Sequence, residues 1–185
     1  MKNIRMFLVL LIYLNSTSNA FGYFAGELSL MASYSKTDYG NSNYSTTRRY
    51  TSAVGYNLTA ITQIELSYIY ADIFFNQDPY QTTSINEQAL ALSVVQSLVP
   101  PNYVIQPYLK GGVAQFNRRT NGTLSGIKLK ENLTKSPSAI AGVGVRVYLL
   151  RNFSLKAEGV CYLPDFQFSQ GKNNFAVQGG VSWSF

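Results

Sequence analysis

Several residue types on which common activities depend are scarce or missing in this chain of 185 residues. It contains no histidine, the commonest general base and the commonest metal ligand among protein side chains. Its single cysteine allows no disulfide within the chain and no cysteine-based metal cluster. Charged residues make up 13% of the chain, about half the share of an ordinary soluble protein. The composition therefore argues against histidine-dependent enzymes, and no metal or cofactor is predicted.

Long apolar runs are also missing. The mean hydropathy is −0.03, whereas a helical membrane protein would carry several apolar stretches of about 20 residues. Aromatic residues, in contrast, reach 14%, with 14 tyrosines and 11 phenylalanines beside 14 glycines. This combination suits twisted β-strands that carry belts of aromatic side chains.

The first twenty residues have the three parts of an export signal. Lys2 and Arg5 give a basic start, residues 6–14 form a short apolar core, and residues 18–20 are small enough for cleavage. An apolar core of about nine residues is too short to anchor the chain in a bilayer, which needs about 20. We therefore predict a signal peptide over residues 1–20 and a mature domain over residues 21–185.

The C-terminal stretch alternates strictly between two kinds of residue. Phe175, Val177, Val181, Trp183 and Phe185 are apolar, and the residues between them are small or polar. A period of two predicts a strand with two different faces. If such a strand closes a barrel in lipid, its terminal aromatic residues belong to the girdle at the membrane interface.

Seven further stretches alternate in the same way. The expected strands cover residues 24–34, 48–57, 63–75, 84–98, 103–117, 137–149, 153–163 and the terminal stretch within 173–185. Longer polar connections are expected at 35–47, 76–83, 118–135 and 164–172, and tight turns at the other three junctions. The predicted fold is therefore an all-β, eight-stranded antiparallel up-and-down transmembrane β-barrel.

A soluble lipocalin-like barrel has the same periodicity, so the inner face must be argued separately. An eight-stranded barrel has room inside only for its own side chains. The face with small and charged residues fits that space, whereas a continuous apolar coat would be unstable in water. A charged cluster is thus predicted in the lumen: Glu27, Glu65, Glu87, Lys110, Arg146, Lys156 and Glu158. These side chains could line a gated polar path or form a plug of buried ion pairs.

Several segments resemble a known family, the small outer-membrane β-barrels of the OmpA/OmpX type. The resemblance is carried by residues 54–59 leading into 64–68, by 107–112, 142–146 and 153–158, and by the terminal Phe185. It implies a location in the bacterial outer membrane, among outer-membrane lipid and lipopolysaccharide. It also implies handling by periplasmic chaperones and the barrel-assembly machinery, for which Val181, Trp183 and Phe185 would form the signal.

The stretch 118–135 is expected to be an extracellular basic loop. It contains five bases, Arg118, Arg119, Lys128, Lys130 and Lys135, and one acid, Glu131. Such a loop could contact lipopolysaccharide phosphates, other polyanionic surfaces, or a host or surface ligand. Nucleic acid is not expected as a partner, because the charge is confined to one loop and does not form a folded basic face.

The predicted function is structural or surface-interactive and adhesin-like, with the barrel as scaffold and the extracellular loops as contact surface. The alternative is a narrow pore for small solutes or ions through the charged lumen. No enzyme activity is expected, because Glu65 and Glu158, which could act as a carboxylate pair in acid–base chemistry, would lie in a lumen too narrow for a substrate.

Overall fold

The computed structural model describes residues 25–40, 43–77, 81–101, 103–124, 127–128, 132–166 and 175–185. The predicted signal peptide, residues 1–20, lies outside these ranges. Within them, no helix is both long enough and apolar enough to cross a membrane.

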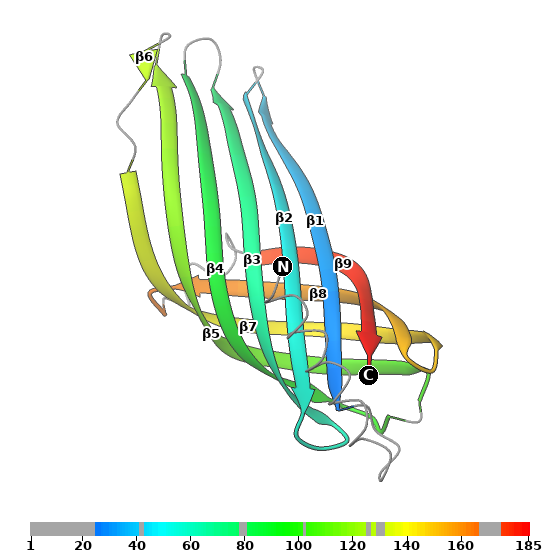
Figure 1. Ribbon diagram of the computed structural model, residues 1–185. Helices are drawn as coiled ribbons and strands as arrows, with labels where there is room; N and C mark the ends of the chain where they lie inside the picture. Colours follow the sequence, from blue (N-terminus) through cyan, green and yellow to red (C-terminus); the bar gives the residue numbers. More distant parts are fainter. Residues whose placement is uncertain are drawn as a thin grey trace, which may run out of the picture.

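Eight long antiparallel strands form a closed barrel (Figure 1). They are β1 (Gly26–Gly40), β2 (Asn43–Asn57), β3 (Thr62–Gln77), β4 (Gln81–Ser97), β5 (Ile105–Leu124), β7 (Asn132–Leu150), β8 (Phe153–Pro164) and β9 (Phe175–Ser184). The short β6 (Ile127–Lys128) pairs only with the end of β5. Each long strand pairs with the next along the chain, and β1 pairs with β9 to close the barrel. The predicted fold is confirmed.

The period of two separates an inner and an outer face. On neighbouring strands, Ser67 and Ser93 point inward and are 1% and 2% exposed. The next residues in the alternation, Leu66 and Leu92, point outward and are 56% and 53% exposed. The apolar face is therefore the outside of the barrel, as a barrel in lipid requires.

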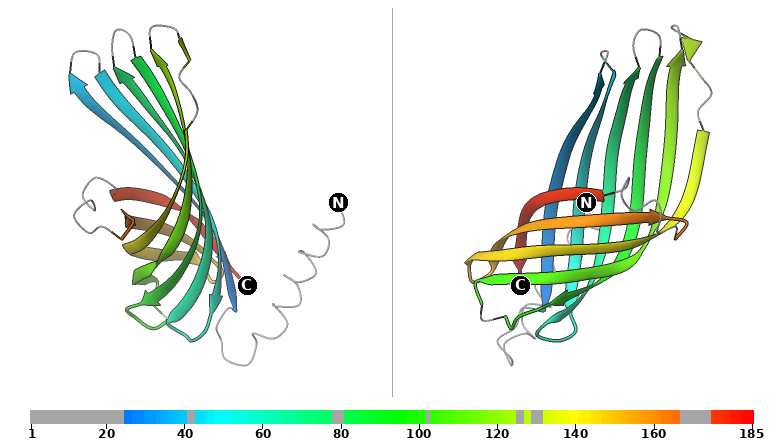
Figure 2. Two further views of the ribbon diagram at one scale, coloured as in Figure 1. Left: turned by 90° about the vertical axis from the view of Figure 1, so that its left-hand side faces the viewer. Right: turned by 180° about the vertical axis from the view of Figure 1, so that it is seen from behind.

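Six of the strands continue far beyond the closed barrel. The pairing of β1 with β9 ends at Ala32 and Gly179, and that of β7 with β8 ends at Ser138 and Pro164. Past the row of paired residues that joins Ser33 to Thr134, strands β1–β5 and β7 go on without β8 and β9. We call this part, residues 33–40, 43–49, 71–77, 81–87, 118–124 and 132–134, the extended sheet; it rises above β8 and β9 in Figures 1 and 2.

The extended sheet corrects the prediction of long polar connections at 35–47, 76–83 and 118–135. Strand β1 runs to Gly40 and β2 begins at Asn43, while β5 runs to Leu124 and β7 begins at Asn132. Outside lipid both faces of a sheet meet water, so no apolar alternation marks the strands in the sequence. The backbone nevertheless stays paired, because tyrosine and threonine, frequent in these segments, favour strands.

A tight turn ends β8 while β7 continues. Asp165 and Phe166 have positive φ angles of 49° and 59°, a region that side-chain-bearing residues seldom adopt and that breaks a strand. The Asp165 amide donates to the carbonyl of Pro137 at 2.8 Å, and the Ser136 hydroxyl donates to the Asp165 carboxylate at 3.1 Å. This turn fixes the height at which the β8 side of the barrel stops.

The ends of β1 and β9 close the barrel through a pair of backbone hydrogen bonds. The amides of Gly26 and Phe185 each donate to the other's carbonyl at 2.9 Å. The ring of Phe185 covers Gly26, where a Cβ would lie 2.6 Å from a ring carbon. Phe185 is therefore only 8% exposed, in contrast to the predicted girdle position, while Trp183 is 48% exposed and Val181 38%.

Candidate functional site

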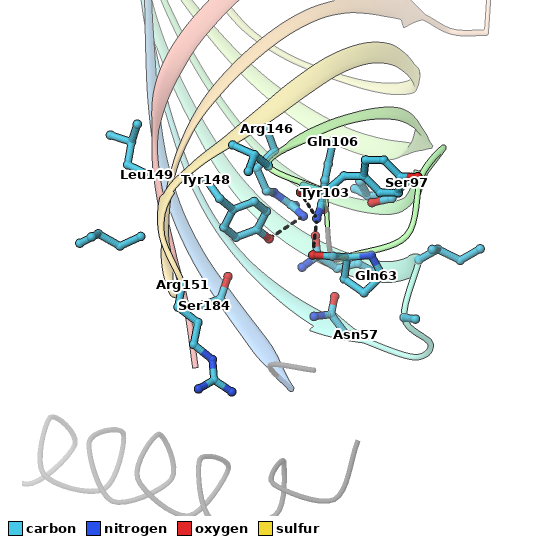
Figure 3. A pocket seen from close by; sticks show the side chains of 16 residues that line it. Asn57, Gln63, Ser97, Tyr103, Gln106, Arg146, Tyr148, Leu149, Arg151 and Ser184 are labelled. Atoms are coloured by element: carbon cyan, nitrogen blue, oxygen red, sulfur yellow. Dashed lines mark hydrogen bonds between the residues drawn. The ribbon is translucent and has the colours of Figure 1, made fainter. Parts of the chain in front are cut away.

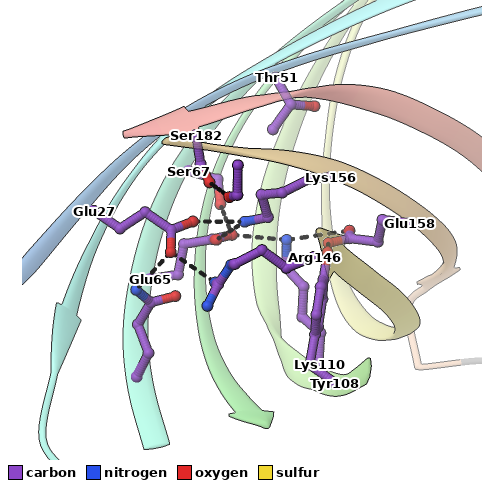
Figure 4. Close-up of polar contacts among 12 residues, drawn as sticks. Glu27, Thr51, Glu65, Ser67, Tyr108, Lys110, Arg146, Lys156, Glu158 and Ser182 are labelled. Carbon is purple, nitrogen blue, oxygen red and sulfur yellow. Dashed lines mark hydrogen bonds and ion pairs between the residues drawn. The ribbon is translucent and has the colours of Figure 1, made fainter. Parts of the chain in front are cut away.

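Six charged side chains meet inside the barrel near the end that carries the tight turns after β2 and β7 (Figure 4). In order of contact they are Arg146, Glu27, Lys156, Glu65, Lys110 and Glu158. Each of them is at most 7% exposed, and they come from five different strands. Three acids and three bases give this ion-pair chain a net charge of zero.

One half of the ion-pair chain is organised by Glu27 on β1. Its Oε2 lies 2.7 Å from Nη2 of Arg146, and its Oε1 accepts a hydrogen bond from Nζ of Lys156 at 3.0 Å. Lys156 Nζ also lies 3.5 Å from Oε2 of Glu65. Glu27 thus bridges two cations, and Lys156 bridges two carboxylates, which is what buried charges need to remain stable.

The other half runs from Glu65 on β3 to Glu158 on β8. Lys110 Nζ lies 2.7 Å from Oε1 of Glu65 and 3.3 Å from Oε1 of Glu158. Glu158 also accepts hydrogen bonds from the Tyr108 hydroxyl at 2.9 Å and from Nε2 of Gln178 at 3.1 Å. The sequence reading did not include Tyr108 and Gln178 among the site residues, although each lies two positions from an inward residue on its strand.

A glycine makes room for the tyrosine beside the ion-pair chain. Gly144 on β7 lies directly opposite Tyr108 on β5, and a Cβ at Gly144 would fall on the tyrosine ring. The ring is 1% exposed and lies 5.6 Å from the ammonium of Lys156 and 5.8 Å from the guanidinium of Arg146. The aromatic face therefore adds a favourable contact to two of the three buried cations.

An apolar layer lies next to the ion-pair chain inside the barrel. Its members are Ile69, Ala89, Ala91, Ala114, Phe116, Ile140, Val160 and Tyr162, all at most 8% exposed. The rings of Phe116 and Tyr162 meet edge to face, with centroids 5.5 Å apart. On β5 and β8 these two residues lie beyond Lys110 and Glu158 when counted from the tight-turn end. An apolar constriction of this kind opposes the passage of water and ions.

A second, smaller group of charges lies beyond the apolar layer. Glu87 on β4 contacts Arg118 Nη2 at 2.5 Å and Arg49 Nη2 at 3.8 Å, and the guanidinium of Arg49 lies 4.7 Å from the centre of the Tyr162 ring. This Arg49–Glu87–Arg118 cluster lies in the row where the extended sheet begins. Glu87 was predicted to join the main lumen cluster, and the structure separates it from that cluster by the apolar layer.

Arg118 was predicted in a loop and lies instead on β5, paired to Glu87. Its side chain is 45% exposed, whereas that of Glu87 is 4% exposed. Arg49 was not predicted at all, although it falls on the same face of β2 as Thr51 and Ala53. Strand parity was the signal that could have found it.

A cavity of about 460 Å³ opens at the tight-turn end of the lumen (Figure 3). It is lined by Gln63, Gln106, Arg146 and Tyr148. Gln106 donates from Nε2 to the carbonyls of Pro101 at 3.0 Å and of Tyr103 at 3.1 Å. Because Arg146 belongs to both features, the cavity ends at the ion-pair chain.

The remaining bases of the predicted loop are dispersed over strands. Arg119 on β5 and Lys135 on β7 are exposed at the outward positions of their strands. Lys128 lies on β6, and Lys130 lies outside the described residues. In the ranges that the structure describes, no three histidine, cysteine, aspartate or glutamate side chains are placed to hold a metal ion.

Solved structures with a similar fold are small bacterial outer-membrane barrels. The N-terminal β-barrel domain of Pseudomonas aeruginosa OprF aligns with a TM-score of 0.59 at 18% identity, over 88% of this chain and 99% of that one. OprG from the same organism gives 0.57 at 11%, over 89% and 98%, and Ail of Yersinia pestis gives 0.53 at 14%, over 86% and 99%. No curated protein matches the chain.

The family described as the OprF membrane domain matches residues 47–185, which is most of the chain. The match begins inside β2 and continues through the last strand. The structure supplies β1 as the remaining strand that closes the barrel. The chain belongs to the OprF membrane-domain family and is a protein of the bacterial outer membrane.

Proposed function

We propose that this protein is a non-conducting, non-enzymatic scaffold of the outer membrane whose extended sheet is its contact surface. The observation that carries the proposal is the filling of the lumen at three successive levels: the ion-pair chain, the apolar layer and the Arg49–Glu87–Arg118 cluster. Export through a cleaved signal over residues 1–20 is part of the same proposal.

Opening a path for ions would require two separate rearrangements. Lys110 and Lys156 would have to leave carboxylates that they contact at 2.7 and 3.0 Å, which would expose uncompensated charges in a confined space. Phe116 and Tyr162 would also have to part, because their rings fill the level beyond. A barrel with an open, water-filled lumen would conduct ions without either rearrangement.

The extended sheet offers the surface that the filled lumen does not. Short turns of outer-membrane barrels face the periplasm, so the extended sheet stands on the extracellular side. Its outward positions include the exposed bases Lys36, Arg48 and Arg119, and Lys135 lies at its border. Ail, whose fold is similar, has been crystallised with the heparin analogue sucrose octasulfate, which supports a polyanionic partner for this surface.

The last strand has a separate role in this proposal. Val181, Trp183 and Phe185 are the segment through which the barrel-assembly machinery, after delivery by periplasmic chaperones, would recognise the chain. Deletion of Phe185 uncovers Gly26 and removes the hydrogen-bond pair that joins β1 to β9, so assembly should fall. Unchanged assembly of the shortened chain would contradict this role.

The second candidate function is a narrow pore. It is favoured by the cavity of about 460 Å³, which brings the periplasmic entrance as far as Arg146. If Arg146 and its neighbours moved aside, the charged residues would become the selectivity elements of a channel.

Conductance across a planar bilayer decides between the two functions. The refolded mature protein should be silent, and the double variant Lys110→Ala, Arg146→Ala should leak, because it leaves Glu27, Glu65 and Glu158 without two of three cations. The control is Arg119→Ala, Lys135→Ala, which removes two cations outside the lumen. Reproducible discrete openings of the unmodified protein would overturn the scaffold function and establish the pore.

A further inference from the structure

The closing seam of the barrel splits where β1 and β9 part. Below Ala32 and Gly179 the two strands are paired, and beyond that point β1 continues into the extended sheet while β9 bends away (Figure 1). Gly180 lets β9 lie close to β1 just before the split, because a Cβ there would overlap the β1 backbone at Leu30. Within the described residues, Ser33 and those after it on β1 pair only with β2.

A groove of about 420 Å³ lies at this split. Leu30, Tyr50, Tyr68 and Val181 line it and are 38% to 55% exposed on the outward face of the barrel. Gly179 forms part of the wall, and a Cβ there would meet no atom closer than a carbonyl oxygen at 3.8 Å. The missing side chain of Gly179 therefore leaves this space open on the face that meets lipid.

From the groove toward the extended sheet, the outward positions of β1 and β2 carry first tyrosines and then bases. Tyr34 and Tyr50 are 64% and 52% exposed at the outward positions where the apolar band ends, as expected for an interfacial aromatic belt. Arg48 lies opposite Tyr34 and about 7 Å beyond Tyr50, at roughly 3.4 Å per residue. Lys36 is the next exposed base on β1 and lies 5.0 Å from the ring of Tyr44.

An acid lies in the same row as Arg48 and must be considered with it. Asp72 is opposite Arg48 on β3, and its carboxylate accepts a hydrogen bond from the Tyr70 hydroxyl at 2.9 Å. In this row Arg48 lies between Tyr34 on β1 and Asp72 on β3. With Lys36 two positions farther along β1, these three charged groups carry one net positive charge.

We propose that the seam is a binding site for one phosphorylated, multiply acylated lipid of the outer leaflet, of the lipopolysaccharide class. One acyl chain lies in the groove beside Gly179, and a glucosamine phosphate is bound by Arg48 with Lys36 behind it. Charge complementarity favours this lipid, because charge-assisted hydrogen bonds from arginine to phosphate are strong and directional. The site uses residues other than those of the proposed lumen plug and does not depend on it.

The groove is tested with Gly179→Leu, which fills it, against Gly111→Leu. Gly111 is an outward glycine on β5 with no atom within 4 Å of its Cβ position, so both variants add a leucine to the lipid-facing surface. The full mature protein is placed in phosphatidylcholine nanodiscs containing hexa-acylated, bis-phosphorylated lipid A, and retained lipid is counted by native mass spectrometry. One lipid A should be retained, and Gly179→Leu should weaken retention by roughly tenfold while Gly111→Leu does not.

The headgroup contacts are tested with Arg48→Gln and Lys36→Gln, and Arg151→Gln at the periplasmic turn is the control of equal charge. Retention should fall for the first two variants and also for lipid A without phosphates. Equal retention of phosphatidylglycerol, or equal effects of Gly179→Leu and Gly111→Leu, would overturn the proposal. Heat-dependent gel migration confirms that each variant is folded, so a loss of retention reports binding.

Discussion

The same six strands run through two environments, lipid and water, and only the lipid requires a closed sheet. In the membrane, β8 and β9 complete the barrel, because every backbone amide and carbonyl in lipid must find a partner in the protein. Among the described residues of the extended sheet, β1 and β7 form the edges, since water can satisfy their free backbone groups. The difference shows that closure here is a requirement of the lipid and not of the strands themselves.

The two groups of charged side chains also differ in how far their members reach water. In the ion-pair chain the side chains of Lys110 and Glu65 are 4% and 2% exposed. Removing one of them therefore leaves the charge of the other buried, with neither an ion-pair partner nor water to stabilise it. In the Arg49–Glu87–Arg118 cluster the Arg118 side chain is 45% exposed. The ion-pair chain should therefore be more sensitive to the loss of one charge than the Arg49–Glu87–Arg118 cluster, in which Arg118 reaches water.

The sharpest test of the comparison is a proline in the same strand at two heights. Ser52→Pro lies in the closed barrel and Thr46→Pro in the extended sheet, and both positions of β2 have partners on β1 and β3. Proline inside a sheet removes a hydrogen bond, and an unpaired carbonyl in lipid costs several kcal/mol more than one in water. Ser52→Pro should abolish assembly into the outer membrane, and Thr46→Pro should assemble, as read by fractionation and heat-dependent migration. Failure of both would show that the extended sheet is part of the folding unit.

A smaller effect is expected from neutralising one acid in each charged group. Glu65→Gln leaves Lys110 and Lys156 with one fewer carboxylate in a buried site and should lower the free energy of unfolding by about 3–5 kcal/mol. Glu87→Gln should lower it by about 1 kcal/mol, because Arg118 can turn to water and Arg49 keeps its contact with the Tyr162 ring. Urea titration of the refolded protein in detergent measures both. Equal losses would mean that the two groups are equally buried in solution.

The sequence was informative where lipid imposes a pattern. Alternation of apolar and polar residues predicted eight strands, their order and the outward face, and it placed Glu27, Glu65 and Lys156 on one inner face. Each of these follows from the period of two, which lipid enforces on one side and a narrow lumen on the other.

Where the pattern ends, the sequence could not predict the structure. The parts of the extended sheet within 35–47, 76–83 and 118–135 were predicted as polar connections, because apolar residues do not alternate there, and Arg118 was assigned to one of them. Its segments 71–75 and 84–87 were predicted as strands. The positions of the inward residues along the barrel axis could not be predicted either. The alternation gives the face on which a residue lies but not its register against the next strand. That is why Glu87 was grouped with Glu65, although the apolar layer separates them, and why Tyr108 was left out of the site.

The smallest effect concerns the surface of the extended sheet itself. Arg119→Gln and Lys135→Gln should each weaken binding of sucrose octasulfate by about twofold to fivefold, the size expected for one exposed ion pair. Titration calorimetry at two salt concentrations measures this, and the binding should weaken as salt screens the charges. Arg151→Gln removes another exposed base, at the periplasmic end, and should leave binding unchanged. If it weakens binding as much as the other two, the attraction follows the net charge of the protein, and the extended sheet is not its contact surface.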